Sequence, residues 1–154
     1  MWGDNQWMNA DLRLEQQVCF ALYAASRAST SAYRQALDSV SLTYPQYLAL
    51  LALWEDDGQT IRQLGDRLFL DSGTLSPLLA RLETAGLVRR ARSADDGRSV
   101  HIHLTGAGAR LRADAEAIQR SLLDQLDMPA EDLAQLRELA QRLVTSFERD
   151  DRRN

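Results

Sequence analysis

Residues 87–105, LVRRARSADDGRSVHIHLT, contain two short β-strand patterns on either side of a turn. Apolar and polar residues alternate over residues 100–104, and residues 87–92 form a second such run. Gly97 lies between them and permits the positive φ that a tight hairpin turn requires. The stretch therefore predicts a β-hairpin, and it is unusually basic. Its arginines are Arg89, Arg90, Arg92 and Arg98.

Two short helices are predicted upstream of this hairpin. Pro45 favours a helix start, because its fixed φ suits the first helical turn, and residues 46–54 form the predicted helix. Thr60 and Gln63 have the spacing of a capping box, in which each side chain satisfies a backbone N–H of the other residue. They predict the next helix, which runs to about residue 68.

A further helix is predicted between the turn at residues 69–73 and Ala85, where Gly86 supplies a left-handed cap. Pro77 lies inside this pattern, so we expect a bend or a late helix start near Thr74. Helix, tight turn, helix and hairpin follow one another in the order of a winged helix-turn-helix, which is a DNA-binding architecture.

Long helical patterns flank this central module. Residues 12–40 contain no proline or glycine, and residues 18–25 are all apolar, so more than one face of the helix must be buried. In so small a protein this predicts that a second subunit supplies part of the cover. Thr105 can cap a fifth helix, and a sixth predicted helix from Pro129 to Phe147 has the narrow apolar seam of a coiled coil.

We therefore expect a mainly α-helical protein with six helices, a winged helix-turn-helix and a wing sheet of two to three strands. The 154 residues suffice for one domain with its own core. The predicted segments are an amino-terminal tail (1–11), a dimerisation helix (12–42), a DNA-binding module (43–105), carboxy-terminal dimerisation helices (106–147) and a second tail (148–154).

Composition narrows the possible functions. The chain has no leader-like segment and no apolar run of the ~20 residues that a membrane span needs, so we expect a soluble, cytoplasmic protein without a membrane partner. Its single cysteine excludes an internal disulfide and a cysteine-based metal site. His101 and His103 share one strand face, but no third ligand is near them in the sequence. We expect both histidines to be solvated, and we expect no metal and no cofactor.

The fourth helix and the hairpin carry the residues that would contact DNA. The first turns of a recognition helix present short polar side chains to base edges in the major groove. Arg98 suits a narrow minor groove, and Asp96 lies close enough in sequence to orient it. The candidates on the helix are Asp71, Ser72, Thr74 and Ser76, with Arg81 two turns later for a phosphate or a guanine. The candidates on the hairpin are Arg90, Arg92, Asp96 and Arg98.

Two observations oppose this interpretation. The net charge is −4, whereas nucleic-acid-binding domains are usually basic. Charged hairpins also protect solvated edge strands in proteins that never contact DNA. The residue pattern by itself therefore leaves DNA binding a hypothesis.

Several blocks of the sequence resemble one family. The hairpin, with Asp96-Gly97-Arg98 followed by a strand, resembles the wing of the MarR family of dimeric bacterial repressors. Other blocks are similar to the organic hydroperoxide resistance regulators, the OhrR group of that family, and the resemblance covers about residues 12–147. These blocks are LTYPQYLALLALWE at residues 42–55, LDSGTLSPLLARLE at residues 70–83, and Cys19 with Phe20 and Tyr23.

The resemblance implies a homodimer that represses its gene by binding a pseudo-palindromic, double-stranded operator. Oxidation of Cys19 by an organic hydroperoxide would release the DNA, and Tyr33 and Tyr44 match the tyrosines that hydrogen-bond the sulfur in such proteins. Arg98 matches the minor-groove arginine, and Asp96 matches its acidic partner. Because the second cysteine of the two-cysteine subgroup is missing, the chain resembles the one-cysteine type. In that type the sulfenic acid forms a mixed disulfide with a low-molecular-weight thiol.

Helix geometry limits which residues could share a site with Cys19. Tyr23 stands one turn away and can wall the same pocket. Tyr33 lies fourteen residues along the helix, about 21 Å at ~1.5 Å per residue, so it cannot reach the cysteine of its own chain. We expect it to come from the partner subunit, with Tyr44 beside it. The apolar residues that would favour organic peroxides over hydrogen peroxide are Phe20, Leu22 and Leu50.

Two other functions remain open from the residues. A regulator of the same fold could be released by a noncovalent small ligand, in which case Cys19 would only fill core space, as most free cysteines do. A thiol peroxidase would use Cys19 for turnover, but it would have no use for an arginine-rich wing. We therefore do not expect an enzyme.

Overall fold

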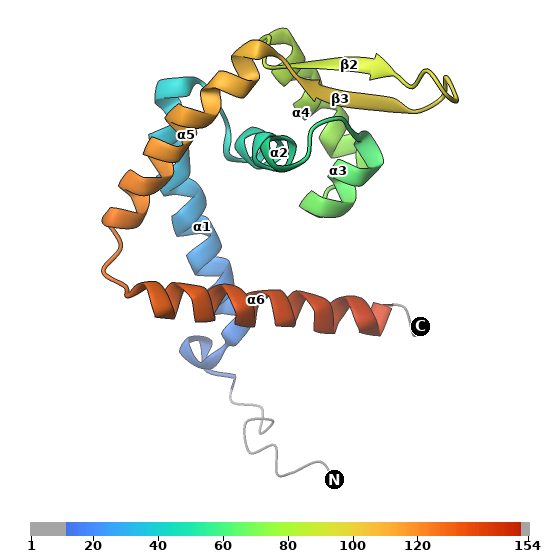
Figure 1. The fold of residues 1–154 in the computed structure, drawn as a ribbon. Coiled ribbons are helices and arrows are strands. Elements are labelled where there is room, and N and C mark those ends of the chain that lie inside the picture. The colour runs from blue at the N-terminus through green and yellow to red at the C-terminus, as the bar shows by residue number, and fades with distance from the viewer. Residues whose placement is uncertain (1–11, 152–154) are drawn as a thin grey trace. The chain divides into compact units, whose positions relative to one another are not determined.

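The computed structural model describes residues 12–151, and Figure 1 shows the course of the chain. The six helices and the small sheet predicted from the sequence are confirmed. The described residues belong to two compact units that meet in sequence between Arg120 and Ser121. The elements in chain order are the 3-10 turn η2 (Leu14–Gln16), α1 (Val18–Leu37), the 3-10 turn η3 (Asp38–Val40), α2 (Tyr44–Glu55), β1 (Gln59–Thr60), α3 (Ile61–Leu68), α4 (Ser72–Thr84), β2 (Val88–Arg92), β3 (Val100–Leu104), α5 (Gly106–Asp124) and α6 (Ala130–Asp151).

The first helix is shorter than its sequence pattern predicted. Gln17 has extended backbone dihedrals (φ −84°, ψ 113°), so α1 begins at Val18 rather than several residues earlier. At the other end, α1 gives way after Leu37 to a 3-10 turn, and Ser41 takes the left-handed conformation with φ 55°. This reversal directs both Leu37 and Leu42 into the core, where they are buried.

Capping boxes begin both α2 and α3. The predicted box at α3 is confirmed, because Thr60 N donates to Gln63 Oε1 at 2.8 Å and Gln63 N donates to Thr60 Oγ1 at 3.1 Å. Thr43 and Gln46 form the same pair of hydrogen bonds, at 2.9 and 3.4 Å. The helix α2 therefore starts at Tyr44, two residues before its predicted start, because the unrecognised box satisfies its first backbone donors.

Asp71 fixes the start of α4. Its Oδ1 accepts a hydrogen bond from Thr74 N at 2.9 Å, just after Phe69 has closed the preceding turn with a left-handed φ of 55°. The helix runs from Ser72 through Pro77, so the predicted late start near Thr74 is wrong. The capped first turn keeps the residues before Pro77 helical, although the proline has no N–H and removes one backbone hydrogen bond.

The predicted hairpin of β2 and β3 is confirmed, and a third strand joins it. The two strands pair antiparallel in a register that sets Val88 opposite Leu104. The strand β1 has only two residues and pairs with the other edge of β3, so the sheet order is β1-β3-β2. We call β2, β3 and their joining loop the wing. In Figure 1 this loop lies at the end of the hairpin that is remote from α5.

A core of mainly aliphatic side chains joins α2, α3 and α4 to the sheet. The middle of β3 contributes Ile102, which is fully buried beneath these helices. One aromatic residue, Tyr47, lies in this otherwise aliphatic group. The largest fully buried side chains are Leu37, Tyr47, Leu50, Leu53, Leu64, Leu75, Leu79, Leu82, Val88 and Ile102.

The start of α5 is fixed against the base of the wing. Thr105 caps the helix, as predicted, by accepting a hydrogen bond from Gly108 N at 3.1 Å. Trp54 Nε1 donates to Gly108 O at 2.9 Å and so ties α2 to the same turn. A Cβ atom at position 108 would stand 2.0 Å from the carbonyl oxygen of Leu87, so this close approach requires glycine.

The histidines of β3 are not freely solvated, contrary to the prediction. His101 Nδ1 lies 2.7 Å from Gly58 O, and His103 Nδ1 lies 3.3 Å from Asp57 Oδ2. Asp57 also accepts a hydrogen bond from Leu104 N at 2.8 Å. Both histidines therefore fasten β3 to the loop before β1. Within residues 12–151, no group of three or more histidine, cysteine, aspartate or glutamate side chains could hold a metal ion.

The helix α6 begins at Ala130, directly after Pro129, close to its predicted start. It extends to Asp151, through residues that the sequence assigned to a tail, whereas the predicted tail at residues 1–11 lies outside the described residues. Its exposed large apolar side chains are Leu136, Leu139, Val144 and Phe147. None of the helices described here is long and apolar enough to cross a membrane.

Candidate functional site

Cys19 lies in the first turn of α1 and is exposed in the single chain. Its apolar neighbours are exposed as well, with Val18 at 67% and Tyr23 at 57% of full accessibility. Along the whole of α1 only Leu37 is buried. The thiol therefore stands on an apolar surface that this chain, as far as the structure describes it, leaves uncovered.

Tyr23, which the sequence placed beside Cys19, has a partner further along the helix. Arg27 Nη1 donates a hydrogen bond to Tyr23 Oη at 3.0 Å, and the guanidinium carbon lies 5.6 Å from the centre of the tyrosine ring. The ring of Phe20 lies nearby, with its centroid 6.4 Å from that of Tyr23. Two predicted pocket residues are thus side by side, and the hydroxyl oxygen of Tyr23 already accepts a hydrogen bond.

Three tyrosines, Tyr33, Tyr44 and Tyr47, form a cluster near the other end of α1. The ring centroids of Tyr33 and Tyr44 are 4.8 Å apart, and those of Tyr33 and Tyr47 are 5.5 Å apart at an interplanar angle of 29°. The structure thus brings Tyr33 and Tyr44 together, and it separates them from Cys19 of the same chain by most of α1, about 21 Å of helix. Sequence reasoning missed Tyr47, although its spacing of three residues from Tyr44 on a helix was the available signal.

Burial controls the pKa values of this tyrosine cluster. It raises the pKa of Tyr44, and it raises the pKa of Tyr47 to about 12, with the nearby Tyr33 and Tyr44 adding to the rise. Burial also raises the pKa of Tyr33, as does the neighbouring Tyr44, whereas a hydrogen bond with Tyr47 lowers it. All three hydroxyls are therefore protonated at neutral pH, and each has a proton to donate.

The helix α4 presents part of the polar surface predicted to contact bases. Ser72, Thr74 and Arg81 are exposed, whereas Ser76 is half-buried. Thr74 N and Thr74 Oγ1 donate to the carboxylate of Asp71 at 2.9 and 3.0 Å, and these bonds lower the pKa of Asp71. Asp71 is therefore the cap of the helix. Among the described residues, Ser72 and Arg81 are the exposed candidates on α4 whose side chains have no such partner.

Asp96 organises the tip of the wing. Its carboxylate accepts hydrogen bonds from the backbone N–H groups of Ser99 and Arg98, each at 3.0 Å, and from Ser99 Oγ at 2.9 Å. These bonds lower the pKa of Asp96. The carboxylate thus positions Arg98 through the backbone of the turn and not through an ion pair with its guanidinium.

The arginines of the wing have different environments. Arg90 Nε lies 3.3 Å from Glu83 Oε2, and Arg90 Nη2 donates to Ser76 O at 3.3 Å, so this residue ties the wing to α4. Arg92 and Arg98 are exposed, and neither guanidinium has an ion-pair partner within residues 12–151. The geometry therefore favours Arg92 and Arg98 over Arg90 as contacts for a phosphate or a groove.

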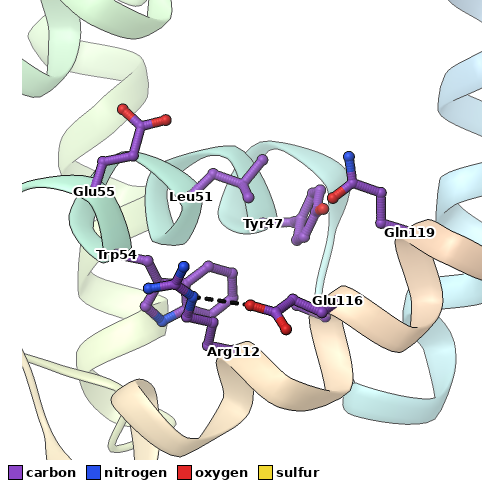
Figure 2. A pocket seen from close by; sticks show the side chains of 8 residues that line it. Tyr47, Leu51, Trp54, Glu55, Arg112, Glu116 and Gln119 are labelled. Atoms are coloured by element: carbon purple, nitrogen blue, oxygen red, sulfur yellow. Dashed lines mark hydrogen bonds and ion pairs between the residues drawn. The ribbon is translucent and has the colours of Figure 1, made fainter.

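A cavity of about 230 Å³ opens between α2 and α5. Arg112 Nε donates to Glu116 Oε1 at 3.1 Å on the α5 side, and the rings of Tyr47 and Trp54 lie on the α2 side. The cavity adjoins the tyrosine cluster through Tyr47. Figure 2 shows the lining side chains, which are Tyr47, Leu51, Trp54 and Glu55 from α2 and Arg112, Ala115, Glu116 and Gln119 from α5.

Comparison with known proteins places this geometry among bacterial regulators. A model of the MarR family matches residues 42–100. The organic hydroperoxide resistance transcriptional regulator of Bacillus subtilis is 49% identical to the chain over 126 residues, a match that covers 82% of this chain and 86% of that protein. The match therefore reaches well beyond the winged module.

Solved structures also resemble the chain over most of its length. Reduced AbfR bound to DNA superposes with a TM-score of 0.77 at 34% identity, over 90% of this chain and 94% of that chain. AbfR of Staphylococcus epidermidis superposes with a TM-score of 0.75 at 37% identity, over 89% of this chain and 95% of that chain. The winged helix-turn-helix fold expected from the sequence is confirmed.

Proposed function

Because the chain belongs to the MarR family of transcriptional regulators, we propose that it is a dimeric repressor that senses organic hydroperoxides through oxidation of Cys19. Oxidation would release its operator. The family relationship identifies a DNA-binding regulator and not an enzyme, so the thiol peroxidase alternative is set aside.

The observation that carries the proposal is the exposed thiol of Cys19 on an apolar surface. A cysteine that only filled the core of its own chain would be buried there, whereas Cys19 lies outside that core, beside the exposed Val18 and Phe20. The thiolate is the form that attacks a peroxide, and apolar neighbours favour a peroxide that carries an organic group. The relationship to an organic hydroperoxide resistance regulator supports the same class of oxidant.

A second copy of the chain would complete the site. Val18, Phe20 and Tyr23 give α1 an exposed apolar surface that a second copy would cover. Cys19 and Tyr33 lie near opposite ends of α1, so antiparallel packing of two such helices would bring the partner subunit's Tyr33 and Tyr44 to the thiol. Their neutral hydroxyls would donate hydrogen bonds to the sulfur of Cys19.

The proposed reaction has two steps. The Cys19 thiolate attacks one oxygen of the hydroperoxide, the O–O bond breaks, and the alkoxide that leaves takes up a proton to become an alcohol. Cys19 is left as a sulfenic acid. A low-molecular-weight thiol then attacks the sulfenic sulfur, which forms the S–S bond of a mixed disulfide and releases water. No intramolecular disulfide can form, since the chain has no second cysteine.

Release of DNA would follow from the changed interface. In a dimer the two α4 helices would enter successive major grooves about 34–36 Å apart, and Arg98 of each wing would enter the minor groove. An oxygen or a bound thiol on Cys19 would break the hydrogen bonds that cross the interface. A modest rotation of one subunit against the other would then remove one α4 helix from its groove.

A gel-shift titration tests this proposal. Wild type and the Cys19→Ser variant are titrated onto a pseudo-palindromic operator, with and without cumene hydroperoxide and a small thiol. We expect both reduced proteins to bind, and we expect oxidant to release only the wild type. Mass spectrometry of the released protein should show one thiol adduct, on Cys19. Release of the serine variant by the peroxide would refute the proposal.

The cavity between α2 and α5 favours a second candidate, which is release by a noncovalent small ligand. At about 230 Å³ it is smaller than most sites for drug-sized molecules, so it suits a small aromatic acid whose carboxylate meets Arg112. Such a ligand would release the Cys19→Ser variant and the wild type equally. Quenching of Trp54 fluorescence by salicylate, with Trp54→Phe as the blank, measures this binding directly.

A further inference from the structure

Phe69 is a large apolar side chain that the winged helix-turn-helix leaves in solvent. It is 69% exposed, and no other large apolar side chain is exposed between residues 24 and 122, all of which the structure describes. The other exposed apolar residues lie within residues 12–23 or 123–147, the segments that a second subunit would cover. A dimer that covers those segments therefore leaves the exposure of Phe69 unexplained.

The backbone conformation at Phe69 is also unfavourable for this residue type. Phe69 ends α3 with left-handed dihedrals, φ 55° and ψ 39°. A Cβ atom disfavours this conformation, so glycine or asparagine is the usual residue where a helix ends in this way. A bulky residue held there is strained, and such strain is typical of functional positions. The other left-handed residues among those described are small: Ser41, Gly58, Gly86 and Gly97.

The turn between α3 and α4 does not depend on the ring of Phe69. Its backbone closes the turn, because the N–H groups of Phe69 and Leu70 both donate to Gly65 O, the second at 3.0 Å. Leu68 and Leu70, on either side of Phe69, pack against the hydrophobic core. The ring of Phe69 lies outside that core and is available for a contact with another molecule.

The position of Phe69 in the chain indicates which molecule that is. Phe69 lies three residues before Ser72, the first residue of α4, and three residues of chain span at most about 11 Å. In the proposed function the first turn of α4 enters a major groove of the operator. The major-groove edge of DNA has one apolar group, the C5-methyl of thymine, and phenylalanine is among the side chains that contact it.

We propose that Phe69 contacts a thymine methyl group in each half-site and so selects thymine at that position of the operator. This inference rests on the DNA-binding part of the proposed function, and it does not depend on the oxidation of Cys19. Polar residues of α4 can select bases through hydrogen bonds, whereas Phe69 adds an apolar contact. Removal of the ring from water on binding offsets the strain of its backbone.

Replacement of thymine by deoxyuridine tests the proposal, because deoxyuridine keeps the hydrogen-bonding groups and lacks only the methyl group. The probe is the duplex that the reduced wild type selects from a randomised pool, with each thymine replaced in turn. Fluorescence anisotropy measures the affinities. We expect the wild type to bind about fourfold more weakly when one particular thymine of a half-site is replaced, which is the effect of one buried methyl group.

The Phe69→Gly variant removes the ring and relieves the backbone strain. It should bind the unmodified duplex at least about fourfold more weakly than the wild type, and it should show no further loss when that particular thymine is replaced. Replacement of the other thymines should affect both proteins equally, which provides an internal control.

A second variant, Phe69→Asn, separates loss of the ring from the added flexibility of glycine. Asparagine tolerates the left-handed conformation, so this variant should melt at or above the temperature of the wild type. Its affinities for the duplexes should match those of Phe69→Gly. A ring that served only to stabilise the fold would give the opposite result, with a lower melting temperature and an unchanged response to deoxyuridine.

Two results would overturn the role of Phe69. One is a Phe69→Gly variant that loses affinity with deoxyuridine at the same positions and by the same factors as the wild type. The other is a marked fall of the melting temperature in both variants, since it would show that the ring packs in the folded chain. A reduced wild type that binds no duplex in the pool contradicts the proposed function itself.

Discussion

The chain contains no lysine, so tyrosines dominate its titration above about pH 9.5. Burial raises the pKa values of Tyr33, Tyr44 and Tyr47 above the unfolded value of 10.0, that of Tyr47 to about 12. The folded state thus holds these protons more tightly than the unfolded state, and the stabilisation present below pH 10 is lost as the pH rises through the folded pKa values.

We therefore expect the free energy of unfolding to fall as the pH rises from 10 to about 12, and to fall less steeply in Tyr47→Phe. Urea unfolding monitored by circular dichroism at a series of alkaline pH values measures both slopes. Identical slopes for the two proteins would show that Tyr47 ionises as freely in the folded chain as in the unfolded one.

Asp96 and Asp95 are adjacent acidic residues with different expected effects on DNA binding. Asp96 holds the turn that positions Arg98, whereas no hydrogen bond to the Asp95 carboxylate is found within the described chain. We expect Asp96→Ala to weaken operator binding about three- to tenfold, because the turn loses its hydrogen bonds. Asp95→Ala removes the same charge and should leave binding unchanged or stronger. Fluorescence anisotropy with labelled operator measures both affinities, and equal effects would mean that only charge matters.

The contact between α5 and the wing depends on the absence of one side chain. A Cβ at Gly108 would overlap the backbone of Leu87, whereas a Cβ at Gly106 would meet only the flexible end of Arg110. We expect Gly108→Ala to lower the free energy of unfolding by about 1–3 kcal/mol through overpacking, and Gly106→Ala to leave it nearly unchanged. Thermal and urea unfolding provide the measurement. A Gly108→Ala protein as stable as wild type would show that the backbone can move apart.

Local signals in the sequence predicted most of the elements. Periodicity and a capping box predicted α3, and alternation around Gly97 predicted the hairpin. The same signals failed where contacts distant in sequence decide the structure. The strand β1 has two residues, too few for any pattern, and forms only because it pairs with β3. His101 and His103 were expected in solvent because their partners belong to the loop before β1.

The candidate site likewise has parts that local sequence signals predicted and parts that contacts distant in sequence determine. Cys19 and its apolar neighbours follow from one helical stretch, and the length of that helix excluded Tyr33 from the site within one chain. The spacing of Tyr47 from Tyr44 put the two on one helix face, but the stacking of Tyr47 on Tyr33 joins two helices and could not be predicted. The carboxylates of Asp71 and Asp96 also accept hydrogen bonds from backbone donors of their own turns, which the sequence did not indicate, and their contacts with DNA stay predictions.

The exposed apolar residues of α1 and α6 predict that the protein is stable only as a dimer. The melting temperature should therefore rise with protein concentration. Leu136→Glu places a charge among the apolar residues of α6, whereas Gln141→Glu adds the same charge at an exposed polar position. We expect sedimentation to show dissociation of Leu136→Glu at concentrations where Gln141→Glu remains dimeric. A monomeric wild type would exclude the shared site.

In the proposed dimer, the tyrosine cluster would determine which subunit responds to an oxidised thiol. Tyr33 belongs to α1, but Tyr44 and Tyr47 belong to α2, which packs on the same core as α4. The cysteine of one chain would therefore be connected, through the tyrosines and α2 of its partner, to the partner's DNA-binding helix α4. In a mixed dimer of one wild-type chain and one Cys19→Ser chain, only the wild-type chain can be oxidised. We expect the Cys19→Ser chain to dissociate first from its DNA half-site, because its tyrosines would contact the oxidised cysteine.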